Sequence, residues 1–468
     1  MKVLFSSSEC SPFVKVGGLA DVVSSLPKSL AQLGVKVSIV IPFYEFLKLK
    51  TPPHLVEKNI SLKFGQNETF DIWQTTLPNT KIPVYLIKNP KYFSGKEVYL
   101  SEDASSEGTQ QEAARFLFLS QATIKLAEIL NTDIIHCHDW ITGIIPYLVK
   151  KEKKNFKTIL TIHNLGYQGI YSPEIVNYFL HTNFSTKVNC LKLGIVNSNR
   201  VTTVSPTYAK EILIPKNGFG LSKYLSQRKN KLRGILNGLD TQTFNPQKDT
   251  FLKKQYSVKA IKNKKYNKVF LQKTYFKAIK PDTPIFALIS RLTSQKGIYL
   301  VEKIIPQLMK QDVQFIVLGK GVKQHENFFV KTAKKFPKKF WIKIGFDEEL
   351  AHQIYAGSDI FLMPSFYEPC GLGQLIAMNY GTIPVVRAVG GLKDTVQPVK
   401  MSSSIIRGTG FTFENFSSKT LWPTIEKVLS LYKDKKIWQQ VQINGMKKDF
   451  SWKKSAREYL DLYSELYS

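Results

Sequence analysis

Short apolar segments alternate with helical segments along almost the whole chain, and this order constrains the fold more than any other feature. In the first half, candidate strands lie at residues 3–5, 35–42, 133–138, 158–163 and 200–205. In the second half, they lie at residues 285–290, 313–319, 341–345, 360–364 and 383–386. Several are apolar at nearly every position, as strands buried on both faces of a parallel sheet are. The pattern predicts α/β architecture with parallel sheets covered by helices on both faces.

The two series of strands predict two domains. A chain of 468 residues is too long for one hydrophobic core. Residues 237–246 separate the series and are rich in turn-forming residues, which is typical of an interdomain hinge. We therefore expect two doubly wound, Rossmann-like domains that face each other across a cleft. Ligands of such sheets bind beyond the carboxyl ends of the strands.

Composition narrows the class of protein. Hydrophobic residues make up 43% of the chain, which predicts packed domains rather than disorder. No apolar run is long enough for a transmembrane helix, and residues 1–8 make a poor signal peptide, so we expect a cytoplasmic protein without membrane partners. The four cysteines (Cys10, Cys137, Cys190 and Cys370) form no CxxC pair, which predicts reduced thiols rather than disulfides or a zinc site.

The net charge of +30 raises the question of nucleic acid. The lysines are spread along the chain, and no arginine-rich arm, zinc finger or RNP-type strand accompanies them. We therefore expect no nucleic-acid partner. A positive field would still attract anionic nucleotides.

A glycine-rich turn at residues 15–19 follows the first strand and opens the first helix. Gly17 and Gly18 would let the backbone approach a ligand, and the N–H groups of the helix start could bind an anion beside Lys15. The turn lacks the Walker pattern, so a tight turn with a surface lysine is an equally good interpretation.

Two loops of the second series carry the other candidate phosphate contacts. Arg291 and Lys296 lie on one short loop after the strand at residues 285–290, where an arginine fork and a lysine point charge would suit a diphosphate. Glu368 precedes Gly371, Leu372 and Gly373, whose N–H groups would be unsatisfied donors at the start of a helix predicted at residues 374–380.

Histidines end two strands of the first series. His136 and His138 share one face of a strand, but no third ligand has suitable local spacing, so we expect no metal site. His163 could be a buried, hydrogen-bonded residue or could line the cleft.

Residues 319–324 look like a dinucleotide fingerprint, but the third glycine is missing, so a nicotinamide dehydrogenase is a weak interpretation.

Taken together, these segments resemble the bacterial glycogen synthases and plant starch synthases over nearly the whole chain. The resemblance rests on the following motifs, in the order of the family: Lys15-Val16-Gly17-Gly18-Leu19-Ala20-Asp21-Val22, His138-Asp139-Trp140, His163-Asn164-Leu165, Asn237-Gly238-Leu239-Asp240, Ser290-Arg291-Leu292, Gln295-Lys296-Gly297, Glu368-Pro369-Cys370-Gly371-Leu372 and Gly381-Thr382-Ile383-Pro384-Val385-Val386.

The resemblance implies a GT-B glycosyltransferase that transfers glucose from ADP-glucose to the non-reducing end of an α-1,4-glucan, keeps the α configuration and needs no metal or other cofactor. It implies an acceptor-side domain at residues 1–240, a nucleotide-sugar domain at residues 241–450, and a C-terminal helix at residues 451–468 that returns to the first domain. The residues that it implies at the catalytic centre are Glu368, His163, Arg291 and Lys296. Those that it implies in substrate binding are Lys15, Gly17, Gly18, Asp21, Asp139, Asn237, Tyr355, Cys370, Gly371, Leu372 and Gly373, with Asp21 on the acceptor side and Tyr355 near the nucleotide base.

The chemistry read from the residues agrees with this resemblance. Cations and helix N–H groups would stabilise the leaving diphosphate, and a carboxylate such as Glu368 would offset positive charge on the sugar. No second carboxylate is evident at nucleophile spacing, so we expect front-face attack.

The chain also departs from the family pattern. Phe366-Tyr367 stand where the family has Arg-Phe, Gly373 where threonine is common and Ile141 where histidine is usual, and residues 93–111 lack the family's Asp-Asn and arginine pattern. Two alternatives therefore stay open: a related transferase that uses UDP-glucose or a small acceptor, and a non-catalytic protein that binds glucan or nucleotide sugar.

Overall fold

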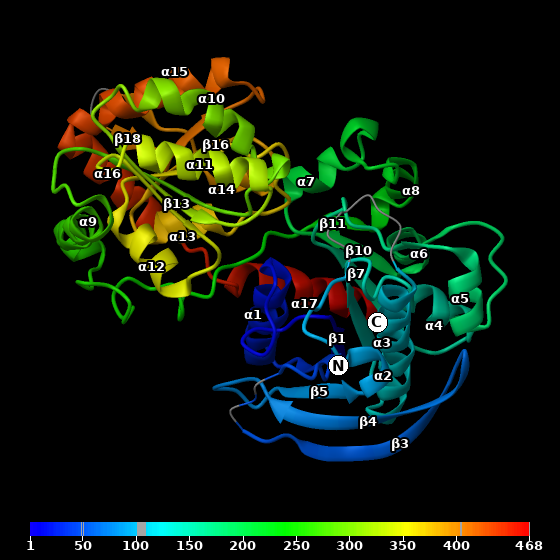
Figure 1. Cartoon of the computed structure of the whole chain (residues 1–468). Coiled ribbons are helices and arrows are strands. Elements are labelled where there is room, and N and C mark those ends of the chain that lie inside the picture. The colour runs from blue at the N-terminus through cyan, green and yellow to red at the C-terminus, as the bar shows by residue number, and fades with distance from the viewer. Residues whose placement is uncertain (48, 50, 101–108, 403–404, 468) are drawn as a thin grey trace. The chain divides into compact units, whose positions relative to one another are not determined.

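The structure is a computed structural model that describes every residue except 48, 50, 101–108, 403–404 and 468 (Figure 1). The chain divides into two compact units. Unit 1 comprises Met1–Gly238 and Trp452–Ser468, and unit 2 comprises Leu239–Ser451. These bounds differ by at most two residues from the domain bounds expected from the sequence. The described helices include none that is long and apolar enough to cross a membrane.

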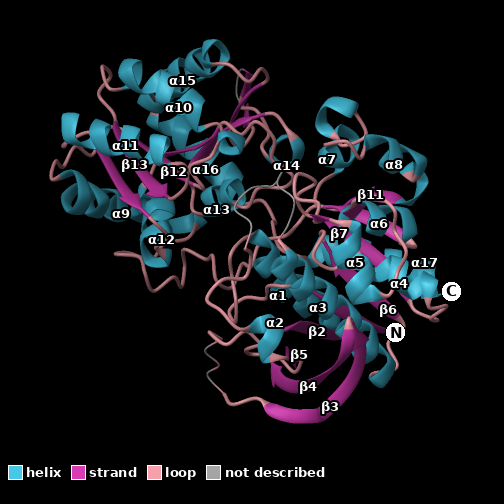
Figure 2. Ribbon diagram, turned by 45° about the vertical axis from the view of Figure 1, so that its right-hand side comes forward, coloured by secondary structure: helices cyan, strands magenta, loops and turns pink. Residues whose placement is uncertain are grey.

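Unit 1 is built on a sheet that has nine strands among the described residues, in the order β11-β10-β7-β6-β1-β2-β5-β4-β3. The strands are β1 (Lys2–Ser6), β2 (Lys36–Pro42), β3 (His54–Phe64), β4 (Gln66–Thr76), β5 (Pro83–Lys88), β6 (Ile134–His138), β7 (Lys157–Ile162), β10 (Arg200–Thr203) and β11 (Leu232–Gly234). Neighbouring strands from β11 to β5 are parallel, whereas β4 pairs antiparallel with β5 and β3. Figure 2 shows the long β3–β4 hairpin at one edge of this sheet.

Helices and one small ribbon complete unit 1. They are α1 (Gly18–Gln32), α2 (Pro90–Phe93), α3 (Gln110–Ile129), α4 (Ile145–Lys151), α5 (Pro173–Leu180), α6 (Cys190–Asn197), α7 (Pro206–Glu211), α8 (Ser222–Gln227), the 3-10 turns η1 (Pro215–Asn217) and η2 (Lys229–Lys231), and the ribbon of β8 (Ile170–Tyr171) and β9 (Val188–Asn189). The last helix of the chain, α17 (Lys453–Tyr467), packs beside α1, the first helix (Figure 1). Its Tyr459, Leu462 and Tyr463 are completely buried in the core of unit 1.

Unit 2 is built on a sheet in which every described strand is parallel to its neighbours, in the order β14-β13-β12-β15-β16-β19. The strands are β12 (Ile285–Ile289), β13 (Gln314–Gly319), β14 (Phe340–Ile344), β15 (Ile360–Met363), β16 (Ile383–Arg387) and β19 (Phe411–Phe413), with a separate ribbon of β17 (Lys400–Ser402) and β18 (Ile405–Arg407). The helical segments are η3 (Val258–Asn263), α9 (Lys264–Leu271), η4 (Gln272–Phe276), η5 (Ser294–Lys296), α10 (Ile298–Leu308), α11 (Lys323–Lys335), α12 (Glu348–Gly357), α13 (Gly373–Asn379), α14 (Gly390–Thr395), α15 (Ser418–Lys433) and α16 (Lys435–Met446).

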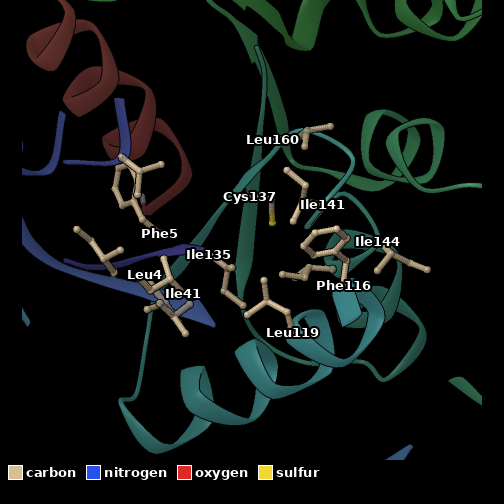
Figure 3. Close-up of a cluster of buried hydrophobic side chains, with 14 of the residues drawn as sticks. Leu4, Phe5, Ile41, Phe116, Leu119, Ile135, Cys137, Ile141, Ile144 and Leu160 are labelled. Carbon is tan, nitrogen blue, oxygen red and sulfur yellow. The ribbon is translucent and has the colours of Figure 1, made fainter. Parts of the chain in front are cut away.

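Apolar side chains of the parallel strands form the cores. In unit 1, Leu4, Ile41 and Ile135 of three neighbouring strands are completely buried and lie near Phe116 and Leu119 of α3 (Figure 3). In unit 2, α10 and α15 cover one face of the sheet, and α12 and α13 contribute to a second cluster. Burying a side chain of this size stabilises the fold by about 1.5–3 kcal/mol.

Each strand predicted from the sequence is present within about one or two residues of its expected ends. The strands of the two main sheets that were not predicted are β3, β4, β5, β11 and β19, and the strands of the two small ribbons (β8, β9, β17 and β18) were not predicted either. In particular, β3 and β4 make the edge of the unit 1 sheet antiparallel, which the expectation of parallel strands does not include.

Candidate active site

The loop that carries Lys296 is held tightly against the carboxyl end of β15. It begins after β12, forms η5 and turns into α10 at Gly297, whose φ of +70° favours glycine. A Cβ at Gly297 would lie 2.0 Å from the carbonyl oxygen of Pro364. Phe366 N–H also donates to the carbonyl of Gln295 at 2.8 Å. Close backbone packing therefore places Lys296 beside the loop that carries Glu368.

Lys296 and Glu368 form a close ion pair. The Lys296 Nζ donates to both carboxylate oxygens of Glu368, at 2.9 and 2.7 Å, and the Ser365 hydroxyl donates to Oε2 at 2.9 Å. The side chain of Glu368 is 6% exposed and that of Lys296 is 18% exposed. The structure thus brings two of the predicted catalytic residues together and fixes the carboxylate with three hydrogen bonds.

The backbone around Glu368 is packed against a second glycine pair. Gly391 N–H donates to the carbonyl of Glu368 at 3.1 Å. A Cβ at Gly390 would lie 2.0 Å from that carbonyl oxygen, and one at Gly391 would lie 2.2 Å from the carbonyl oxygen of Cys370. Only glycines fit in this contact, so Gly390 and Gly391 hold the Glu368 loop in place. Sequence reasoning missed them.

Arg291 lies on the same loop as Lys296 but reaches solvent. It is exposed, and its guanidinium donates to Oε1 of Gln295 at 3.2 Å. Arg291 and Lys296 are therefore both at the carboxyl edge of the sheet, as predicted, although only Lys296 contacts Glu368.

The start of α13 lies at the same edge of the sheet. Gly371 has φ +73° and Cys370 is 5% exposed. The Gln374 side chain donates to the carbonyls of Cys370 and Gly371, at 3.1 and 2.8 Å. Leu372 is the N-cap residue and α13 begins at Gly373, so the N–H groups of these residues lie in the first turn of the helix, as the sequence predicts.

Tyr355 lies on α12, and its place near the nucleotide base stays a prediction. It is 4% exposed and its ring packs on Phe361 inside unit 2. Sequence reasoning missed Phe346, which is 79% exposed and follows β14 at the carboxyl edge of the sheet. Its position could have been read from the sequence, because Phe346 directly follows a predicted parallel strand, and ligands bind at the carboxyl ends of such strands.

In unit 1, a buried carboxylate holds the glycine-rich turn. Oε2 of Glu9 accepts hydrogen bonds from the N–H groups of Val16 and Gly17, at 2.5 and 2.9 Å, and Oε1 accepts one from the hydroxyl of Tyr99. Glu9 is 2% exposed. The N–H of Gly17 is therefore already bonded, and the N–H groups expected to bind an anion at the helix start begin with Gly18, the first residue of α1. Sequence reasoning missed Glu9.

The side chains of the glycine-rich turn pair with each other. Lys15 Nζ lies 2.7 Å from Oδ1 of Asp21, which belongs to the first turn of α1. Gly17 is the N-cap residue of α1, Gly18 is its first residue, and a Cβ at Gly17 would meet nothing within 4 Å. The turn thus leaves open space beside Lys15.

Asp139 and His163 meet at the carboxyl ends of β6 and β7. Oδ1 of Asp139 accepts the backbone N–H groups of His163 and Asn164, at 2.7 and 3.3 Å. Asp139 has a φ of +53°, in the left-handed region that few non-glycine residues adopt and in which Asp is enriched. Burial and the charge of Glu9 raise the pKa of Asp139 and the two backbone hydrogen bonds lower it, which leaves the pKa at about 7.

His136 and His138 lie stacked in the interior of the sheet. Their ring centroids are 4.5 Å apart and both residues are 0% exposed. Among the described residues, no three His, Cys, Asp or Glu side chains lie close enough to hold a metal ion.

Asn237 lies three residues beyond β11, is 8% exposed, and has a buried Oδ1 with no partner in the described part of the chain.

The predicted site residues therefore form one group in each unit. Arg291, Lys296, Glu368 and residues 370–373 lie at the carboxyl edge of the unit 2 sheet. In unit 1, Lys15, Gly17, Asp139, His163 and Asn237 lie on loops, and Gly18 and Asp21 lie in the first turn of α1. Their assembly into one site stays a prediction.

The positions that depart from the family pattern have different surroundings. Ile141 is 3% exposed and belongs to the core of unit 1. Phe366 is 48% exposed and packs on Phe416, and the Arg387 guanidinium lies within 6.0 Å of both rings. Of residues 93–111, residues 101–108 lie outside the described part.

Two family models match the chain. Residues 2–227 match the starch synthase catalytic domain, and residues 272–444 match the glycosyl transferases group 1. Among curated proteins, a glycogen synthase from Kosmotoga olearia is 42% identical over 483 residues, with 100% of this chain and 98% of the relative covered. A glycogen synthase from Bacillus cereus is 40% identical over 486 residues, with both chains fully covered.

Solved structures give the same result. The catalytic domain of starch synthase IV from Arabidopsis thaliana, bound to ADP and acarbose, superposes with a TM-score of 0.90 at 33% identity, covering 100% of this chain and 99% of that chain. A sucrose-phosphate synthase from Thermosynechococcus elongatus superposes with a TM-score of 0.65 at 18% identity, with the same coverage. This second likeness concerns the fold alone.

Proposed function

Because this chain belongs to the glycogen and starch synthase family, we propose that it transfers glucose from ADP-glucose to the non-reducing end of an α-1,4-glucan with retention of configuration. It is a glycosyltransferase of the GT-B class, with two Rossmann-like domains. The identity of the nucleotide, the retention and the glucan acceptor are the proposed parts.

The observation that carries the proposal is the carboxylate–ammonium pair of Glu368 and Lys296 at the carboxyl edge of the unit 2 sheet. When the bond between the anomeric carbon and the diphosphate breaks, the sugar gains positive charge and the diphosphate gains negative charge. A fixed carboxylate and a fixed ammonium stabilise these opposite charges without reorganisation. Both groups are largely buried, which strengthens their effect.

The leaving diphosphate also needs partners besides Lys296. Arg291 is exposed on the same loop, and the first N–H groups of α13 carry the positive end of a helix. The starch synthase IV structure was solved with ADP bound, which supports an adenine nucleotide for this chain as well. Phe346 offers an exposed ring to the base.

Retention is proposed to proceed by front-face attack. A covalent intermediate would need a second carboxylate at nucleophile spacing on the opposite face of the sugar, and none is evident from the sequence. The leaving phosphate then takes the proton of the attacking hydroxyl. A glucosylated carboxylate trapped and detected by mass spectrometry would contradict this mechanism.

The polar groups of unit 1 are proposed to bind the sugars. Lys15, Asp139, His163 and Asn237 all lie on loops, and together they offer both donors and acceptors to hydroxyl groups. The acarbose in the starch synthase IV structure supports a glucan-like acceptor. We place the enzyme in the cytoplasm, where a nucleotide sugar would be available, and propose no nucleic-acid or membrane partner.

The decisive experiment compares ADP-glucose and UDP-glucose as donors, with glycogen as acceptor, and measures release of the nucleoside diphosphate and incorporation of glucose. We expect a higher kcat/KM with ADP-glucose. A preference for UDP-glucose would overturn the choice of donor. Binding of glycogen without release of ADP would overturn catalysis and favour a binding protein.

A further inference from the structure

We infer that His138 is a positioning residue that fixes the ring and the tautomer of His163, so that His163 carries its proton on Nδ1 and offers a donor to the sugar. The inference rests on the proposed function in one respect, namely that His163 contacts the substrate. The contact that carries it is a ring–ring hydrogen bond, in which Nδ1 of His138 lies 3.0 Å from Nε2 of His163.

His138 is a rigid partner for this bond. Its backbone N–H donates to the Thr142 hydroxyl at 2.7 Å, and its ring stacks on Phe5, with centroids 5.4 Å apart, and on His136, at 4.5 Å. The residue is completely buried, whereas His163 is half-buried. A ring that is held by two stacking contacts, on a backbone anchored by a hydrogen bond, can fix the orientation of the ring that it touches.

Both rings are neutral near pH 7. Burial lowers the pKa of His163 to about 3, and burial together with neighbouring imidazoles holds the pKa of His138 well below its usual range. Each ring therefore carries one N–H, and only one of the two can supply the hydrogen of the shared bond.

The surroundings of His138 decide which ring donates. Its other nitrogen, Nε2, is buried and has no hydrogen-bond partner among the described residues. If His163 donated, His138 would have to carry its proton on Nε2, where the N–H would be a buried donor without an acceptor. Such orphaned donors are rare in folded proteins. We therefore assign the shared proton to Nδ1 of His138.

The assignment fixes the chemistry of His163. Its Nε2 accepts the bond from His138, so its proton lies on Nδ1, which makes no hydrogen bond to another described residue. A half-buried Nδ1–H is an available donor for a sugar hydroxyl. Asp139 supports the same residue from its other side, because its carboxylate accepts the backbone N–H of His163.

The tautomer can be measured directly on the full-length chain. With ¹⁵N-labelled histidine, long-range ¹H–¹⁵N correlation spectra separate the two tautomers of each ring, and the loss of one set of signals in His163→Asn assigns His163 among the seven histidines. We expect the Nδ1–H form in the unsubstituted protein. An Nε2–H form would overturn the inference.

Two substitutions of His138 test its role. His138→Asn keeps an N–H donor near the position of Nδ1, so we expect His163 to stay in the Nδ1–H form and kcat/KM for the nucleotide sugar to stay within about threefold. His138→Phe keeps the stacking ring but removes the donor, so we expect a mixture of tautomers and a loss of about tenfold in kcat/KM, the size of one hydrogen bond. An unchanged tautomer in His138→Phe would overturn the positioning role.

The outcomes are separable from those of the proposed function. If the chain transfers no glucose but His163 has the Nδ1–H form and loses it in His138→Phe, the positioning role stands and the proposed function fails. If transfer occurs and His163 has the Nε2–H form, the proposed function stands and the positioning role of His138 fails.

Discussion

At the scale of single residues, the ion pair of Lys296 and Glu368 separates catalysis from stability. We expect Glu368→Gln to lower kcat at least about a hundredfold, because a neutral amide cannot offset positive charge on the sugar. The melting temperature should fall by no more than about 2–4 °C, since the amide keeps the shape and the hydrogen bond of Ser365.

A matched control is Glu302→Gln, which replaces a carboxylate on α10 whose Oε1 lies 2.8 Å from Nδ1 of His325 on α11. Its melting temperature should change by a similar amount without loss of transfer. Full activity in Glu368→Gln would remove this residue from the mechanism.

Lys296→Ala tests the binding of the diphosphate. We expect the dissociation constant of the nucleotide sugar to rise about tenfold or more, because a charge-assisted hydrogen bond is lost and the Glu368 carboxylate is left to repel the phosphates. Titration calorimetry with ADP measures the effect. Lys303→Ala removes an equal charge from an exposed position on α10 and serves as control; equal affinities in the two variants would refute the phosphate role.

Gly17→Ala tests whether the open space beside the glycine-rich turn holds substrate. A Cβ at this position meets no atom within 4 Å and φ is −143°, so the free energy of unfolding should change by about 0.5 kcal/mol or less. We expect KM for the nucleotide sugar to rise several-fold nonetheless. Unchanged kinetics in a stable variant would show that no ligand occupies this space.

At the scale of elements, the parallel strands could be predicted from the sequence and the edge of the unit 1 sheet could not. Strands such as β12 and β13 are apolar at nearly every position, so their burial is visible in the sequence. In β3, most residues are exposed and charged residues interrupt the alternation, which hides the strand. Its position depends on pairing with β4, a contact that no local pattern specifies.

The candidate site was predictable to a similar extent. Loops that follow strands gave Lys296, Glu368 and His163, because the carboxyl edge of a parallel sheet is where ligands bind. Glu9 and His138 were not predicted as supports, since their roles depend on neighbours that are close only in the folded chain.

His136 on β6 forms hydrogen bonds to β7 and α17, and its burial predicts that the stability of the fold depends on pH. His136 bonds to the Tyr463 hydroxyl and to Oγ1 of Thr161, and burial lowers its pKa from 6.5 to about 3. Between pH 6.5 and about 3, the unfolded chain binds a proton at His136 that the folded chain does not bind. The free energy of unfolding therefore decreases as the pH falls.

We expect His136→Gln to reduce the slope of the free energy of unfolding by about 1.4 kcal/mol per pH unit. The measurement is urea unfolding of both proteins at several pH values between 6.5 and about 4. Parallel curves for the two proteins would contradict the buried neutral state of His136.

At the scale of the whole molecule, the site residues that each unit carries predict that unit 1 binds the acceptor and unit 2 binds the donor. The dependence of unit 1 on the last helix can be tested directly. Removal of residues 453–468 would expose the core that Tyr459, Leu462 and Tyr463 cover, at a cost of several kcal/mol.

We expect this truncation to make unit 1 sensitive to proteases while unit 2 stays resistant, as judged by limited proteolysis and mass spectrometry of the fragments. The control is Tyr467→Ala, which alters the same helix at a residue that is 60% exposed. Equal resistance of both units in the truncated chain would contradict the role of α17.

The return of α17 to unit 1 affects the order in which the two units can fold during synthesis on the ribosome. Unit 2 is one continuous segment, so it can fold as soon as its own residues have emerged. Most of unit 1 is translated before unit 2 but lacks part of its interior until α17 has been synthesised. Unit 1 is therefore completed after unit 2, and a product that terminates before α17 carries an unfinished unit 1.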